Sequence, residues 1–418
     1  MKITIVNTTD IRGGAAIAAF RLFKALRDRL PETKMLVSEK LTDTANVVGH
    51  DNSSWQRLMI KFRFYLERIS FILRSDSRDG WFAFSPANTG RDISRHPDIQ
   101  NADIIHLHWI NGGYLSLSSL KKLIKTGKPI VWTLQDMWAF TGGCHYTGTC
   151  TNFERGCGDC KYLKFRSGKD LSSRIHRRKM KIFSSGNINF IGSSNWMAES
   201  ARRSSLAGKS KVTVLPNPIE IEIYKPADKN AIRDRLGLPR DKFLILSGAA
   251  NFKDKRKGFH YLLQALRLMA ETHPEISGHF GLITFGKSSD VNDSPITVYP
   301  QAYLKDDNEI AQLYQAADVF VLPTLEDNLP STVIESLACG TPVVAFNTGG
   351  IPDMVDHKSN GYLAELRNTE DIVSGISWVE NHPDLNRIRE NCRTKVVLNF
   401  SPEVVATKYM SFYRTLIQ

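Results

Sequence analysis

The stretch that decides the fold is "VFVLPTLEDNLPSTVIESLACGTPVVAF", residues 319–346. It begins with the apolar run VFVLP and ends with the apolar run PVVAF. Between these runs, residues 331–338 are predicted to form a short helix, which Gly340 and Pro342 terminate. Two buried strands that flank a helix predict a parallel sheet covered on both faces.

The same alternation of strands and helices extends over the rest of the chain, whose 418 residues suit two domains. We therefore predict an α/β fold with two doubly wound domains. The N-terminal domain is predicted at 1–217, a linker at 218–230 and the C-terminal domain at 231–418. An alternative is that the last helix, at about 400–418, packs on the N-terminal domain. Further strands are predicted at 2–7, 103–109, 130–134, 189–194, 212–217, 243–248 and 279–286.

The composition is that of a globular protein with an excess of positive charge. The formal net charge is +12, which favours anionic partners such as phosphates, nucleic acid or acidic lipid. No apolar run reaches the ~18 residues that span a bilayer, so we expect a cytoplasmic protein. The apolar and basic stretch 55–74 is either a core helix or a surface helix on a membrane. A peripheral contact with the inner face of the membrane therefore stays open.

Acidic residues cluster where a ligand of the second domain is expected. Ligands of open parallel sheets bind outside the carboxyl ends of the strands. Glu326 and Asp327 lie in the loop after the predicted strand 319–323, and Glu335 lies in the helix that follows. Carboxylates at this place can accept hydrogen bonds from sugar or ribose hydroxyls. The alternative is that they are helix-start charges stabilised by the helix dipole.

With these residues the chain resembles the retaining glycosyltransferases of family four, which have the GT-B fold of two Rossmann-like domains facing across a cleft. That family carries Glu-x7-Glu in its second domain, then PV and a GG turn; here the pattern is Asp327-x7-Glu335. The resemblance implies that Glu335 binds the ribose hydroxyls of the donor nucleotide. It implies that Asp327, or Glu326 in its place, lies by the transferred sugar. Asn328 and Leu329 would then present backbone N–H groups to the donor.

A second match lies at "GAANFKDKRKGF", residues 248–259. Lys257 matches the family lysine that grips the donor diphosphate, whereas Asn251 stands where the family has an arginine. Arg256 is a candidate substitute for that arginine. A cation is needed because the leaving diphosphate gains charge in the transition state, and the family normally uses no metal for this purpose. No cofactor is therefore expected to be required for the chemistry. The alternative is a solvated helix start, which the helix dipole disfavours for cations.

The first domain resembles the family as well. Gly13 and Gly14 follow the first strand and would let backbone approach donor phosphate or acceptor closely. Gln135 stands where the family has a catalytic-site histidine that helps hold the donor sugar. Glutamine can hydrogen-bond there but cannot become cationic. The residues that the resemblance places on the acceptor side are His108, Asn111 and Asp136.

Four cysteines fall within seventeen residues inside a predicted insertion at 141–162. In a reduced cytoplasm such a cluster predicts a structural zinc site, with free thiols and disulfides as alternatives. A similar insertion occurs in bacterial polysaccharide-building members of the family. The predicted ligands are Cys144, Cys150, Cys157 and Cys160, and His145 is a competing ligand.

The resemblance implies an enzyme that transfers a sugar from a nucleoside-diphosphate sugar to a hydroxyl of a glycan, with retention at the anomeric carbon. By resemblance, the acceptor is a lipid-linked oligosaccharide in O-antigen, capsule or exopolysaccharide synthesis, and attack is from the front face. The first alternative is another GT-B enzyme, such as a nucleotide-sugar epimerase or a phosphorylase. The second is a basic nucleic-acid-binding protein, although the sequence has no nucleic-acid-binding motif.

Overall fold

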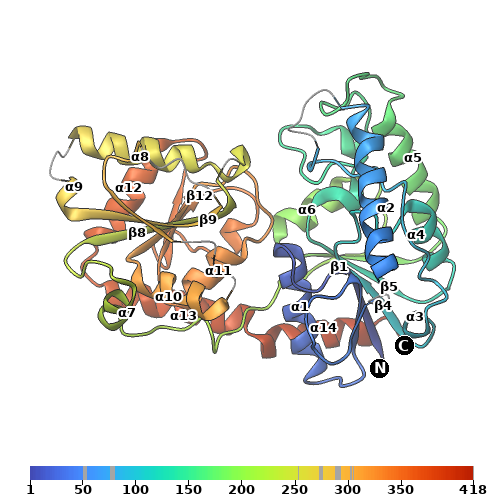
Figure 1. The fold of residues 1–418 in the computed structure, drawn as a ribbon, viewed down its shortest axis with the longest axis horizontal. Coiled ribbons are helices and arrows are strands. Elements are labelled where there is room, and N and C mark those ends of the chain that lie inside the picture. The colour runs from blue at the N-terminus through green and yellow to red at the C-terminus, as the bar shows by residue number, and fades with distance from the viewer. Residues whose placement is uncertain are drawn as a thin grey trace. The chain divides into compact units, whose positions relative to one another are not determined.

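The computed structural model describes residues 1–49, 54–75, 81–252, 254–272, 276–287, 293–301, 304 and 306–417. The chain divides into two compact units (Figure 1). Unit 1 comprises Met1–Pro218 and Val405–Gln418, and unit 2 comprises Ile219–Val404. The chain thus leaves unit 1 after Pro218 and returns to it at Val405. The last segment belongs to unit 1, which was the alternative that the sequence left open.

Unit 1 is built on a seven-stranded sheet in which every recorded pair of strands is parallel. The predicted parallel sheet is therefore confirmed. Two strands that the sequence did not predict, β2 and β3, extend it at one edge. In spatial order the strands are β3 (Val47–Gly49), β2 (Lys34–Glu39), β1 (Ile3–Thr9), β4 (Ile104–Leu107), β5 (Ile130–Leu134), β6 (Ile188–Gly192) and β7 (Val212–Val214).

Helices accompany the strands of unit 1, and the last helix of the chain closes its fold. Helix α14 (Pro402–Arg414) buries Tyr409 and Tyr413 in the same apolar cluster as residues of β1 and β4. The Tyr413 hydroxyl lies 2.6 Å from Nδ1 of His106, whose Nε2 lies 2.7 Å from Thr133 Oγ1. The other helices are α1 (Gly14–Arg27), α2 (Ser54–Ile72), α3 (Pro97–Gln100), α4 (Leu117–Ile124), η2 (Met137–Phe140), η3 (Asn152–Glu154), α5 (Leu171–Phe183) and α6 (Asn195–Arg203).

Unit 2 is built on a six-stranded parallel sheet. Alternate residues of its first strand point into different apolar clusters, Leu244 and Leu246 into one and Ile245 into the other, so both faces are covered. Numbered by their order in the chain, the six strands lie across the sheet in the order 3-2-1-4-5-6, which is that of doubly wound nucleotide-binding sheets. In space the strands are β10 (Thr297–Gln301), β9 (Phe280–Lys287), β8 (Phe243–Asn251), β11 (Val319–Leu322), β12 (Val343–Phe346) and β13 (Gly361–Ala364).

The stretch that decides the fold forms β11, α11 (Ser331–Ala338) and β12, as predicted. The predicted linker at 218–230 differs from the structure, because Ile219 and Tyr224 are buried in the core of unit 2. No helix among the described residues is long and apolar enough to cross a membrane. The remaining helices of unit 2 are α7 (Lys229–Leu236), η4 (Lys255–Lys257), α8 (Phe259–Thr272), α9 (Ile276–His279), α10 (Asp307–Ala316), η5 (Ile351–Asp353), α12 (Thr369–Glu380) and α13 (Leu385–Phe400).

Candidate functional site

The loop between β11 and α11 brings predicted donor-site residues of unit 2 together. Lys257 Nζ lies 2.7 Å from Asp327 Oδ2, and Arg256 Nη1 lies 3.5 Å from the same oxygen. Arg256 Nη1 also donates a hydrogen bond of 2.7 Å to the backbone carbonyl of Glu326. Burial alone would raise the pKa of the Asp327 carboxyl, but the charges of Lys257 and Arg256 lower it below its usual value. Asp327 is therefore an anion held between two cations.

Two glycines let this loop approach its neighbours closely. Gly258 has φ +67°, and a Cβ built there would overlap the carbonyl oxygen of Pro323. Gly349, in the predicted GG turn, has φ +58°, and a Cβ there would overlap the carbonyl oxygen of Asp327. That same carbonyl accepts a hydrogen bond of 3.0 Å from the N–H of Gly350. The backbone around Asp327 is thus fixed from both sides by positions that suit glycine.

Glu335 lies in α11 with only 7% of its surface exposed. The hydroxyl of Tyr314, from α10, donates a hydrogen bond of 3.2 Å to Glu335 Oε2. Burial and the neighbouring Glu335 raise the pKa of Tyr314 well above its usual value, so this hydroxyl stays a donor. Tyr314 therefore orients the carboxylate that is predicted to bind ribose.

The other predicted donor residues of this loop have different surroundings. The side chain of Leu329 packs in the core of unit 2, so only its backbone can face a ligand. Asn328 is buried, and its N–H donates a hydrogen bond of 3.0 Å to Asp327 Oδ1. Glu326 is partly exposed, which leaves Asp327 as the acid at the centre of the charged contacts.

Unit 1 has a cavity of about 1070 Å³ that opens at the carboxyl ends of β1, β2 and β4. Gly13 and Gly14 line it, and a Cβ built at either would meet no heavy atom within 4 Å. The predicted glycine turn thus borders open space, as a binding role requires. Sequence reasoning did not single out several lining residues that come from distant segments, namely Thr8, Arg12, Lys40, Tyr65 and Trp109.

Predicted polar residues gather at the ends of the neighbouring strands β4 and β5. Gln135 Nε2 lies 3.1 Å from His108 Nδ1 and 3.4 Å from the side-chain oxygen of Asn217. Burial lowers the pKa of His108 to about 3, so its ring is neutral. Among the described residues, His108 Nε2 and Asn111 Nδ2 are buried without a hydrogen-bond partner. Neither residue lines the cavity of unit 1, so these two polar atoms are buried without the partner that such groups normally have.

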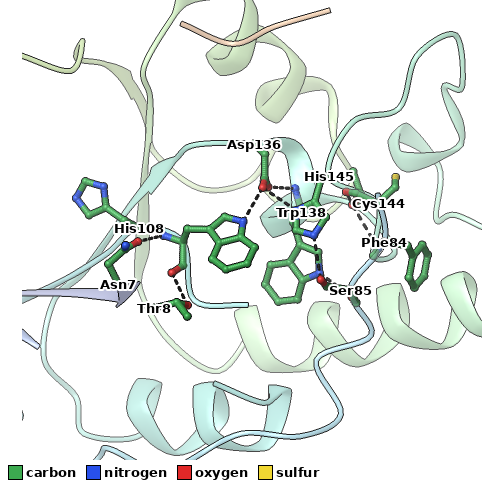
Figure 2. Close-up of polar contacts among 12 residues, drawn as sticks. Asn7, Thr8, Phe84, Ser85, His108, Asp136, Trp138, Cys144 and His145 are labelled. Atoms are coloured by element: carbon green, nitrogen blue, oxygen red, sulfur yellow. Dashed lines mark hydrogen bonds and ion pairs between the residues drawn. The ribbon is translucent and has the colours of Figure 1, made fainter. Parts of the chain in front are cut away.

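Asp136 is the centre of a network that sequence reasoning did not find (Figure 2). Its Oδ2 accepts a 3.0 Å hydrogen bond from Trp109 Nε1 and lies 2.6 Å from His145 Nδ1. His145 Nε2 lies 2.9 Å from the hydroxyl of Ser85, to which Arg68 donates a 2.8 Å hydrogen bond. Although Ser, His and Asp lie in line, Ser85 is fully buried, so the arrangement cannot present a nucleophile to a substrate.

The network instead positions the cavity wall. Trp109 lines the cavity of unit 1, and its ring stacks on His145 at 5.9 Å. Asp136 Oδ1 also accepts a 2.8 Å hydrogen bond from the N–H of Trp138, at the start of η2. Because Asp136 is occupied by these three contacts, the structure gives it a positioning role beside the predicted acceptor side.

A buried lysine, Lys179, holds the backbone at the start of the cysteine-containing segment 141–162. Nζ of Lys179, in α5, donates hydrogen bonds to the carbonyls of Trp138 and, at 3.0 Å, Thr141. Burial lowers the pKa of Lys179 to about 7. Burial and the neighbouring thiols raise the pKa of Cys144, and burial raises those of Cys157 and Cys160 to about 11. These three thiols are therefore protonated at neutral pH in this structure.

All of the cysteines are free thiols in this structure. Across the described part of the chain, no group of three or more His, Cys, Asp or Glu is arranged to hold a metal ion. The donor atoms therefore do not form a zinc ligand set here, and the structural zinc stays a prediction. Metal analysis of protein purified without chelator tests it: about one zinc per chain is expected if four thiolates bind the ion, and none would reject the site.

Comparison with solved structures identifies the fold class of the chain. The chain superposes over 100% of its length on 100% of the Anabaena protein HepE in complex with UDP, with a TM-score of 0.63 and 17% identity. Two parallel Rossmann-like sheets with this arrangement of strands define the GT-B fold of glycosyltransferases. Residues 242–381 match the sequence model of the family "Glycosyl transferases group 1". The match lies within unit 2 and covers about a third of the chain, so this part of the chain is similar to group 1 glycosyl transferases.

Curated relatives match only part of this chain. An uncharacterized glycosyltransferase of Haemophilus influenzae is 34% identical over 138 residues, 31% of this chain and 37% of the relative. A UDP-Gal:alpha-D-GlcNAc-diphosphoundecaprenol alpha-1,3-galactosyltransferase of Escherichia coli is 26% identical over 200 residues, 46% of this chain and 51% of the relative. The chain therefore spans between about a third and a half of the length of these relatives.

Proposed function

We propose that the protein is a retaining glycosyltransferase of family four that moves a sugar from a nucleoside-diphosphate sugar to a hydroxyl of a glycan acceptor. The observation that carries this proposal is the contact of Lys257 and Arg256 with Asp327, beside the helix that bears Glu335. These residues lie within the segment that matches the group 1 family. They come together at the carboxyl end of β11, where ligands of such sheets bind.

Each residue then has a defined task. Lys257, with Arg256 beside it, balances the charge that the leaving diphosphate gains as the sugar–phosphate bond breaks. Glu335, oriented by Tyr314, accepts hydrogen bonds from the ribose hydroxyls. Asp327 holds Lys257 in place and lies by the transferred sugar. The leaving phosphate oxygen takes the proton of the acceptor hydroxyl in front-face attack, so no protein nucleophile is required.

The acceptor is proposed to bind in unit 1, in the cavity bordered by Gly13, Gly14 and Trp109. Its size exceeds the ~300 Å³ at which small-molecule sites begin, so it has room for sugar units. A lipid-linked oligosaccharide of bacterial polysaccharide synthesis is the proposed acceptor. The Escherichia coli relative, whose name specifies a diphosphoundecaprenol-linked acceptor, supports this choice.

Thermal shift against a panel of nucleoside diphosphates and their sugars tests the donor assignment. A ligand at a hundred times its dissociation constant stabilises the folded state by ~2.7 kcal/mol, which raises Tm by a few degrees. We expect the nucleotides of one base to give this shift, and UDP is the first candidate because HepE was solved with UDP. The matched control is Lys257→Ala, in which the shift should shrink. Absence of any shift across the panel would reject the donor site.

A further inference from the structure

Helix α2 of unit 1 (Figure 1) carries several apolar side chains that are exposed to solvent. Its apolar side chains recur at alternating spacings of three and four residues, which places them on one face of the helix. Trp55 is 68% exposed, Phe62 52% and Leu73, just beyond the helix, 73%. The further exposed apolar residues of this face are Leu58, Tyr65, Leu66 and Ile69. A soluble monomer rarely exposes so continuous an apolar face, which marks an interaction surface.

The opposite face of α2 carries the charges that hold the helix in place. Glu67 is fully buried, and its Oε2 accepts a 2.7 Å hydrogen bond from the N–H of Gly113. Arg68, also buried, donates to the carbonyls of Trp81 and, at 3.1 Å, Phe84. An ion pair of 3.4 Å joins Arg68 to Glu67. These polar contacts fix the orientation of α2 in unit 1. Its apolar face is therefore held toward solvent by the fold.

Cations lie on one flank and at the C-terminal end of this apolar face. The only acidic residue of α2 is Glu67, which the buried contacts occupy, whereas Lys61 is exposed on the flank of the helix. Just beyond the helix end, Arg74 lines a shallow cavity together with Arg174 and Arg178 of α5. The residues described around that cavity include no aspartate or glutamate. An apolar face bordered by cations is complementary to a lipid bilayer, which has an apolar interior and can carry anionic head groups.

We infer that the exposed face of α2 docks on an anionic lipid bilayer and lies in its interface. Trp55, Tyr65 and Phe62 are aromatic residues, which favour the interface between the head groups and the acyl chains. The flanking cations attract acidic head groups. A second copy of the chain fits less well, because pairing two such faces would bring cations toward cations. The inference deepens the proposed function and rests on it for its purpose, the capture of a lipid-linked acceptor.

The position of the cavity in unit 1 agrees with this purpose. Ile60, Lys61, Phe64 and Tyr65 of α2 line the cavity in which the acceptor is proposed to bind. Tyr65 is also 60% exposed and belongs to the apolar face. One helix therefore borders both the proposed membrane surface and the proposed acceptor cavity, so the sugar of a lipid-linked acceptor could enter while its lipid stays in the bilayer.

Co-sedimentation of the purified full chain with vesicles tests the inference, without nucleotide or sugar. Vesicles of equal parts phosphatidylglycerol and phosphatidylcholine are compared with vesicles of phosphatidylcholine alone. We expect binding to the anionic vesicles that weakens in high salt. The double variant Phe62→Ser/Ile69→Ser should lower the apparent partition constant about tenfold or more, because two exposed apolar side chains no longer enter the interface. Arg74→Gln/Arg174→Gln should weaken binding to the anionic vesicles only.

The matched control is Leu366→Ser/Leu398→Ser, which removes two apolar side chains of unit 2 that are 42% and 64% exposed. It should bind vesicles like the wild type. Equal binding by the control and the α2 variant, or no binding by the wild type, would overturn the inference. A wild-type dimer that Phe62→Ser/Ile69→Ser converts to a monomer would assign the face to a second copy instead. The nucleotide thermal shift is measured on the same variants, so a failed donor site is distinguished from a failed membrane surface.

Discussion

Replacement of Lys257 by alanine is expected to lower kcat/KM about a hundred- to a thousandfold. Lys257 Nζ lies 2.7 Å from Asp327 at the end of β11, where the donor diphosphate is proposed to bind. Without it, the charge that develops on the leaving phosphate is balanced by Arg256 alone. Steady-state kinetics with the donor found by thermal shift measures the effect. Because the interaction strengthens in the transition state, we expect kcat to fall more than KM rises.

Two variants control this experiment. Lys255→Ala removes an exposed lysine from the same short helix, η4, and should leave kcat/KM within about twofold of the wild type. Lys257→Arg keeps the charge but not the shape, so it should recover part of the activity. A Lys257→Ala enzyme with nearly wild-type turnover would place the diphosphate elsewhere.

Replacement of Glu335 by alanine is expected to weaken nucleoside-diphosphate binding about tenfold to a hundredfold and to reduce transfer below detection. Hydrogen bonds from the ribose hydroxyls to a buried carboxylate are charge-assisted, and alanine removes both acceptor oxygens. Isothermal titration calorimetry with the nucleoside diphosphate measures the loss directly. Glu335→Gln, which keeps one acceptor oxygen but not the charge, should give an intermediate affinity.

The control for Glu335→Ala is a change of its hydrogen-bond partner, Tyr314. Glu335→Ala leaves the buried hydroxyl of Tyr314 without this acceptor, which destabilises the fold by about 1–3 kcal/mol. Tyr314→Phe breaks the same hydrogen bond but keeps the carboxylate, so it should bind nucleotide more tightly than Glu335→Ala. If both variants lost affinity equally, the loss would come from the altered packing and not from a ribose contact.

The parallel α/β architecture could be predicted from the sequence because its central strands are continuous apolar runs. Strand β5 and helix α11 have the predicted bounds, since both are buried and flanked by residues that end an element. Three missed strands, β3, β10 and β13, are edge strands, whereas the missed β2 lies inside its sheet and is buried. Strand β10 has exposed and half-buried residues and contains Pro300, and β3 has only three residues. Edge strands bury less apolar surface, so their sequence carries a weaker pattern.

The candidate site could be predicted only where its residues are neighbours in the sequence. Asp327 and Glu335 share one strand–loop–helix unit, so their common location follows from local pattern. The ion pair between Lys257 and Asp327 joins residues 70 positions apart. The contact between Ser85 and His145 spans 60 positions. Such contacts depend on how distant segments pack, which neither spacing nor residue type specifies.

The return of α14 to unit 1 has a consequence for how the protein is made. Unit 2 is one continuous segment, Ile219–Val404, inserted into unit 1. The hydroxyl of Tyr413 and the ring of His106 meet across 307 positions of the chain. On the ribosome, therefore, unit 2 has all of its residues before unit 1 receives α14. Until α14 has been synthesised, the surface of unit 1 that it covers stays open to chaperones.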